Sequence, residues 1–221
     1  MSIKENLEHI QERIAKAAAP WGRAKEDIHL LAVSKRQSID SIQTALDCGH
    51  RQFAENKVQE ATQHWAELKP RHPDLQLHLI GPLQTNKIKD ALALFDVIHT
   101  VDREKLARKL GAALRAENRS IPCFIQVNIG KEDQKSGIAP NDLPAFLKFC
   151  QTECALNIQG LMCIPPADEP AALYFALLQK MAKAHGLSEL SMGMSADFER
   201  AIPLGATYIR VGTGIFGQRE S

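Results

Sequence analysis

The sequence has almost no net charge, and it lacks a long hydrophobic run and an apolar amino terminus. Its 27 Lys and Arg residues are balanced by 26 Asp and Glu residues, which leaves a formal net charge of +1. Because nucleic acids and membrane surfaces select strongly basic patches, this balance argues against either partner. No apolar run approaches the roughly 20 residues that a membrane-spanning helix needs. The first residues include Glu5, Glu8 and Glu12 in place of the apolar core of a signal peptide, so we expect a cytoplasmic protein.

The cysteines are few and follow no ligand pattern. There are five of them, and no two form a C-x-x-C pair. An odd number without that pairing argues against both a zinc ribbon and a disulfide framework. Cys150 and Cys154 stand four residues apart on an expected helix. We expect this pair to be reduced and buried.

The length and composition fit an ordinary globular protein. The chain has 221 residues, of which 44% are hydrophobic and 24% are charged. It is long enough for one large α/β domain or two small ones. No linker or shift in composition divides it, so we expect a single domain over residues 1–221.

Eight short apolar runs alternate with segments of helical periodicity. Strands are expected at residues 28–34, 52–54, 75–80, 97–99, 123–128, 158–163, 190–192 and 208–211. A helix is expected between each strand and the next, but not after the last. Such alternation favours βαβ units, and eight of them close into a (β/α)₈ TIM barrel; an open doubly wound sheet is the alternative. The amphipathic helix expected over 3–19 could fill the gap beside the last strand.

Lys35 stands where the first strand should end. Four apolar residues, 30–33, run into Ser34-Lys35, with an expected helix on either side, which is typical of a strand buried on both faces. Chemistry in a barrel gathers at the carboxyl ends of the strands. A lysine desolvated there can be partly deprotonated and can form a Schiff base with an aldehyde. This stretch alone favours a solvated loop lysine; the rest of the chain reverses that preference.

The loops after the last two strands are suited to an anion. Ser195 is placed to cap the helix after the seventh strand, and a helix amino terminus offers free N–H groups. The run 212–217 after the eighth strand has three glycines, which let the backbone approach an anion closely. Either loop alone is more often a plain turn, but together they predict a phosphate cradle. The G-x-G-x-x-G match in 212–217 is no dinucleotide fingerprint, because it does not follow the first strand of a βαβ unit.

Arg210 lies near the end of the eighth strand. Its guanidinium can only donate hydrogen bonds, so it could hold a ring nitrogen unprotonated. Alternatively it could pair with Asp197 or Glu199. A Schiff-base lysine, a phosphate cradle and a cation for a pyridine nitrogen are the groups that pyridoxal 5′-phosphate (PLP) requires.

Several ordered motifs resemble one family. They lie at residues 33–35, 53–56, 78–84, 86–87, 99–102, 135–137, 160–162, 190–195 and 209–217. With these motifs the chain resembles the pyridoxal phosphate homeostasis proteins, which are single-domain barrels related to the amino-terminal domain of alanine racemase, of PLP fold type III. The resemblance spans nearly the whole sequence.

The resemblance implies how PLP would be held. It implies an internal aldimine on Lys35, with the phosphate, the pyridine nitrogen and the ring each contacted by particular residues. The implied contacts are Ser195, Gly212 and Thr213 at the phosphate, Arg210 at the pyridine nitrogen and Asn56 near the ring.

The sequence departs from the family pattern at several positions. Ala54 and Lys57 stand where the family usually has glycine and tyrosine, and Leu77 replaces an aromatic residue. A proline common shortly after the lysine is missing from residues 36–38. We expect these departures to change the wall of the pocket and not the role of the lysine.

Racemisation needs an acid or base on each face of the substrate carbon. Lys35 could serve one face. In alanine racemase the other group is a tyrosine from a second domain, which we expect to be absent because the sequence ends four residues after Gly217. Tyr174 and Tyr208 are expected to be packing residues. An arginine at the ring nitrogen also weakens the cofactor as an electron sink. We therefore favour a PLP-binding protein that buffers, delivers or senses the cofactor over a PLP-dependent amino-acid racemase.

The residues themselves leave several other interpretations open. A phosphosugar-binding barrel would use Lys35 as a phosphate contact. His78 and His99 are possible bases, although structural roles are favoured. Apo PLP enzymes are expected as possible recipients of the cofactor, and the resemblance suggests a monomer. Lysines near expected loops should be solvated, or one could hold PLP transiently; these are Lys57, Lys87, Lys89, Lys131 and Lys135.

Overall fold

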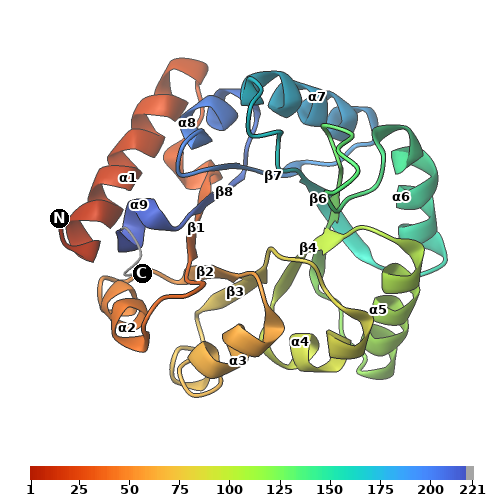
Figure 1. Ribbon diagram of the computed structural model, residues 1–221, viewed down its shortest axis with the longest axis horizontal. Helices are drawn as coiled ribbons and strands as arrows, with labels where there is room; N and C mark the ends of the chain where they lie inside the picture. The colour runs from red at the N-terminus through yellow and green to blue at the C-terminus, as the bar shows by residue number, and fades with distance from the viewer. Residues whose placement is uncertain (218–221) are drawn as a thin grey trace.

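Eight parallel strands close into a barrel with helices around it (Figure 1). The computed structural model describes residues 1–217. The strands are β1 (His29–Val33), β2 (Gln52–Glu55), β3 (Gln76–Leu79), β4 (Val97–Val101), β5 (Pro122–Gln126), β6 (Asn157–Met162), β7 (Glu189–Met194) and β8 (Tyr208–Val211). They follow chain order around the barrel, and β8 pairs with β1. The (β/α)₈ prediction is confirmed, and the open sheet is excluded. The expected domain over 1–221 includes residues 218–221, which lie outside the described residues.

The helices pack their apolar faces onto the outside of the barrel. They are α1 (Ile3–Ala18), α2 (Ile39–Asp47), α3 (Val58–Trp65), α4 (Ile88–Leu94), α5 (Glu104–Ala116), α6 (Leu143–Thr152), α7 (Ala171–Ala184), α8 (Phe198–Ala201) and α9 (Thr213–Phe216). The prediction that no helix follows the last strand is wrong, because α9 begins directly after β8 at Thr213. Its single turn is too short to show a helical period. The expected place of the first helix is confirmed, since α1 contacts α2, α8 and α9.

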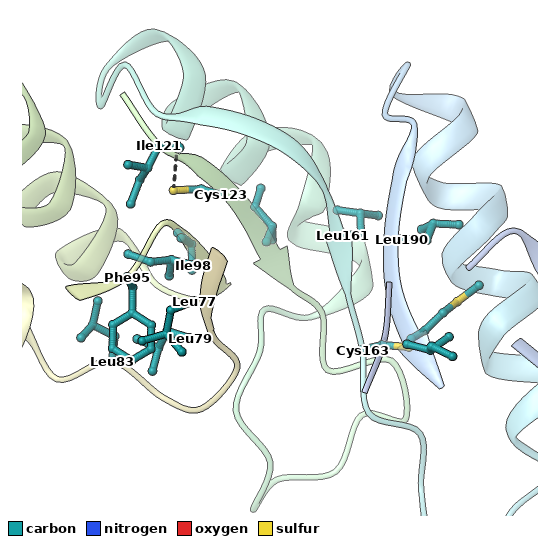
Figure 2. Packing of buried hydrophobic residues seen from close by; sticks show 14 of the residues in the cluster. Leu77, Leu79, Leu83, Phe95, Ile98, Ile121, Cys123, Leu161, Cys163 and Leu190 are labelled. Atoms are coloured by element: carbon teal, nitrogen blue, oxygen red, sulfur yellow. Dashed lines mark hydrogen bonds between the residues drawn. The ribbon is translucent and has the colours of Figure 1, made fainter. Parts of the chain in front are cut away.

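Two layers of core follow from the alternation of side chains along each strand. The outer core lies between strands and helices; Figure 2 shows part of it, with Leu77, Phe95 and Ile98 packed together. The barrel interior holds two smaller clusters of buried residues, and Tyr208 packs against both. These clusters are Leu31, Val33 and Ala54, and Val97, Phe124 and Met162. Leu31 and Val33 therefore mark the inward-facing positions of β1.

His78 and His99 meet inside the barrel. His78 Nδ1 lies 3.0 Å from His99 Nε2, and both side chains are fully buried. His99 stacks on Phe124, and the ring of Tyr208 lies 5.6 Å from each histidine. Burial lowers the pKa of His78 to about 3 and the pKa of His99 well below its ordinary value. Both rings and Tyr208 pack inside the barrel, although His78 Nε2 and His99 Nδ1 have no hydrogen-bond partner among the described residues.

The described cysteines form no disulfide. Cys150 and Cys154 are both buried thiols, which confirms the expectation for this pair. Burial raises the pKa of Cys150 to about 12, so its thiolate is disfavoured. Across residues 1–217, every helix is too short or too polar to cross a bilayer.

Candidate functional site

Lys35 occupies the turn that follows β1. Its side chain is half-buried. Side chains alternate between the two faces of a strand, and Lys35 is an even number of residues after Leu31 and Val33, which face the barrel interior. The preceding residue is tied to the neighbouring strand, because the Ser34 N–H donates to the Ala54 carbonyl oxygen at 3.0 Å. The structure therefore sets this lysine at the carboxyl end of β1, where the sequence predicted it.

A buried carboxylate that the sequence analysis missed lies beside this turn. Glu55, the last residue of β2, is fully buried. Its Oε1 accepts a hydrogen bond from Ser34 Oγ at 2.7 Å and lies 2.8 Å from His64 Nδ1. Trp65 Nε1 donates to the same oxygen at 3.2 Å. The only signal for Glu55 in the sequence was the presence of an acidic residue at the end of a strand that is buried on both faces.

The loops after β7 and β8 come together beside β1. A Cβ atom built on Gly214 would lie 3.9 Å from Ser195 Oγ. One built on Gly212 would lie 3.4 Å from the carbonyl oxygen of Val33. Thr213 begins α9, whose leading N–H groups have no acceptor within the helix. Ser195, Gly212 and Thr213 are therefore brought to one side of the Lys35 turn.

The predicted capping role of Ser195 is wrong. The N-cap position of α8 is Asp197, two residues later. The Asp197 side chain accepts a hydrogen bond from the Met194 backbone N–H at 2.6 Å, which turns the chain before the helix begins. Ser195 stays half-buried in that turn, with its hydroxyl close to Gly214.

Arg210 crosses the inside of the barrel from β8. It is only 4% exposed, and it donates to Ser191 Oγ at 2.8 Å and to the Cys163 carbonyl oxygen at 2.9 Å. The alternative ion pair is not formed, because Glu199 pairs with Arg13 at 2.9 Å. Asp197 hydrogen-bonds its own turn. Burial lowers the pKa of Arg210, and the nearby Cys163 and Asp197 oppose that shift.

Asn56 follows β2 and lines a cleft of about 270 Å³. Residues after β3, β5 and β6 complete its wall, together with Gln134, Lys135 and Ser136. None of the other five predicted site residues is among its described lining residues. Lys135 departs from the expectation of a solvated lysine, since its Nζ donates to the Pro165 carbonyl oxygen at 3.0 Å. Asn56 follows the carboxyl end of β2, the strand that pairs with β1 through Ala54 and Val33.

Comparisons with known proteins identify the family of this chain. A family described as alanine racemase, N-terminal domain, matches residues 2–220. The pyridoxal phosphate homeostasis protein of Vibrio cholerae is 40% identical, covering 99% of this chain and 97% of the relative. That of Pseudomonas aeruginosa is 41% identical, covering 99% and 96%. The chain belongs to the pyridoxal phosphate homeostasis protein family.

Solved structures agree with this membership. PipY of Synechococcus elongatus, determined with PLP bound, is 38% identical with a TM-score of 0.80, covering 94% of this chain and all of PipY. An alanine racemase from Clostridium difficile is 13% identical with a TM-score of 0.70, covering 96% of this chain and 57% of the racemase. The racemase shows the fold alone. The expected resemblance to the homeostasis family is confirmed.

Three of the departures from the pattern of the homeostasis family fall in different places. Ala54 faces the barrel interior, as a pocket-wall position should. Leu77 belongs to the outer core, so the expectation that it alters the pocket wall is wrong. Lys57 is exposed just before α3. A one-residue step along β3 reverses the facing of a side chain, which explains why Leu77 and His78 lie on opposite sides.

Proposed function

We propose that this protein binds PLP at Lys35 and buffers, delivers or senses the cofactor as part of PLP homeostasis. The observation that carries the proposal is the convergence of the loops after β7 and β8 on the end of β1. Gly212 approaches Val33 from β8, and Ser195 approaches Gly214 from β7. The structure of PipY with PLP bound supports PLP as the ligand of this barrel.

The residues present fit the cofactor. When bound, PLP supplies an aldehyde that links to an amine and a ring that can withdraw electrons. Lys35 provides the amine, while Ser195, Gly212 and Thr213 provide hydroxyl and N–H donors to a phosphate. Gly212 brings its loop close to the end of β1, where a Cβ added to it would lie 3.4 Å from the Val33 carbonyl oxygen.

Arg210 and Asn56 would complete the site on the ring side. A guanidinium has no acceptor, so Arg210 facing a pyridine nitrogen holds that nitrogen unprotonated. An unprotonated ring draws electrons weakly, which favours holding PLP over transforming an amino acid. Asn56, at the end of β2, would lie near the ring.

The tyrosines also favour a carrier. Tyr174 is on the outside of α7, where its hydroxyl donates to Glu169 at 2.5 Å. Tyr208 begins β8 and packs among the interior rings of His78 and His99. In the described residues, neither tyrosine is placed to act opposite Lys35. The proposal is therefore a non-catalytic, single-domain, monomeric protein of the cytoplasm, with apo PLP enzymes as recipients.

Titration of the purified protein with PLP is expected to produce a yellow absorbance that borohydride removes. The Lys35→Ala variant should lose this absorbance, because the linking amine is gone. Lys89→Ala removes an exposed lysine and should keep it. A wild-type protein that stays colourless at saturating PLP would contradict the proposal and favour a phosphosugar-binding barrel.

Delivery and turnover need separate assays. Mixing the PLP-loaded protein with an apo PLP enzyme is expected to restore the activity of that enzyme. Incubation with single-enantiomer amino acids, followed by chiral chromatography, is expected to show no change. Steady racemisation that depends on Lys35 would overturn the carrier assignment.

A further inference from the structure

Both residues that flank Lys35 are held by carboxylates from the next βα unit. On one side, Ser34 Oγ donates to Glu55 Oε1 at 2.7 Å. On the other side, the Arg36 backbone N–H donates to Glu60 Oε1. Glu55 ends β2 and Glu60 lies in the first turn of α3, so one rigid unit holds the Lys35 turn at two points.

The backbone after Lys35 is in an unfavourable conformation. Arg36 has a φ of 57°, in the left-handed region that residues with a side chain rarely adopt. Such residues persist only where their surroundings compensate for the strain. Two hydrogen bonds around this turn compensate for the strain. Glu60 accepts one from the Arg36 N–H, and the Gln37 N–H donates the other to the Ser34 carbonyl oxygen at 3.1 Å.

Glu55 is an unusual residue to find in this place. It is fully buried, and although Oε1 has three partners, Oε2 has no hydrogen-bond partner among the described residues. A buried carboxylate is unfavourable unless it is paired with positive charge. His64 lies beside this carboxylate, and its hydrogen bond to Glu55 raises the pKa of His64 against the effect of burial, with the charges of Glu55 and Glu60 adding to the rise.

We propose that Glu55 and Glu60 are positioning residues for the Lys35 amine, with His64 hydrogen-bonded to Glu55. The two carboxylates fix the turn so that Lys35 is presented to PLP in one orientation. This inference rests on the proposed function. Glu55, Glu60 and His64 also offer ligand atoms within 4.8 Å of one another, as a metal site would. His64 Nδ1 lies 2.8 Å from Glu55 Oε1, the distance of a direct hydrogen bond between the two side chains.

Charged groups from neighbouring elements also face His64. The cleft between α2 and α3 that His64 borders is lined by Asp40, Glu67 and Arg71 as well. A raised pKa means that the folded protein holds the proton more tightly than the unfolded chain. The stabilisation is therefore fully present below about pH 6.5 and is lost as the pH rises through the raised pKa.

Removing the Glu60 carboxylate tests the inference. Glu60→Ala is expected to weaken PLP binding about tenfold, equivalent to about 1.4 kcal/mol, and to speed amide exchange at Arg36 and Gln37. Glu60→Gln keeps an oxygen acceptor and should restore binding to within about twofold of wild type. Glu153→Ala removes an exposed carboxylate at the end of α6 and should change nothing.

The reactivity of the Lys35 amine gives a readout that needs no PLP. Competitive acetylation of the PLP-free protein, followed by mass spectrometry across a pH series, should give an altered Lys35 profile in Glu60→Ala and a wild-type profile in Glu60→Gln. Glu55→Gln should also alter it; if that variant does not fold, Ser34→Ala removes the same contact. Wild-type binding, exchange and acetylation in Glu60→Ala would overturn the inference. If wild type itself fails to link PLP, the proposed function fails, while exchange and acetylation still decide the positioning role.

Discussion

Gly81→Ala is expected to destabilise the fold by about 3 kcal/mol, near the upper end of the usual effect of overpacking a core. A Cβ at this position would lie 2.0 Å from the carbonyl oxygen of Asn56 and 2.8 Å from its Cα. Both clashing atoms are backbone, so no side chain can rotate away. The end of β2 must move, and with it the residue expected near the PLP ring. Urea denaturation measures the loss, and PLP titration should show weakened binding.

Gly212→Ala is the matched control for stability. Its added Cβ would lie 3.4 Å from the Val33 carbonyl oxygen, a distance that a small shift accommodates. Its φ of −110° is open to any residue. We expect its free energy of unfolding to fall by less than about 1 kcal/mol. Equal losses in the two variants would show that Asn56 and Gly81 are not in close contact.

Acidification is expected to destabilise the protein through the interior histidines. The pKa of His78 is lowered to about 3 in the folded state, against 6.5 ordinarily. Below pH 6.5 the unfolded chain binds a proton at His78 that the folded protein does not, so the free energy of unfolding falls as the pH falls. The loss is about 1.4 kcal/mol per pH unit, or about 3 kcal/mol near pH 4.5. His99 changes in the same direction.

His78→Asn separates this effect from the titration of surface carboxylates. An asparagine amide can occupy the position of Nδ1 and keep a hydrogen bond to His99, but it does not titrate. Urea denaturation between pH 7 and pH 4.5 should show a shallower pH dependence in the variant, by about one proton. Identical slopes would mean that His78 is not held neutral inside the barrel.

The barrel could be predicted from the sequence because its signals are local. Each buried strand is a short apolar run such as 30–33, and the helices between the strands have a clear apolar period. Lys35 could be predicted as a strand-end residue for the same reason. The approach of Gly212 to Val33, two residues before Lys35, depends only on the closure of the barrel, which brings β8 against β1.

The predictions that were wrong or missing concern contacts between residues distant in sequence, or the face of a strand on which a side chain lies. A shift of one residue along a strand reverses that face. No pattern showed that Glu55 would accept a hydrogen bond from Ser34, which is 21 residues earlier. Ser195 was expected to cap α8, but the chain turns through Asp197 first. Leu77 was assigned to the pocket wall, although its phase on β3 directs it to the outer core.

The most direct test of the account is to locate the bound cofactor on the chain. The PLP-loaded protein is reduced with borohydride, digested and mapped by mass spectrometry. We expect the pyridoxyl label on Lys35 and on no other lysine. A label absent from Lys35, or shared equally with Lys135 in the Asn56 cleft, would contradict the assignment of the amine at the end of β1 as the PLP-linking group.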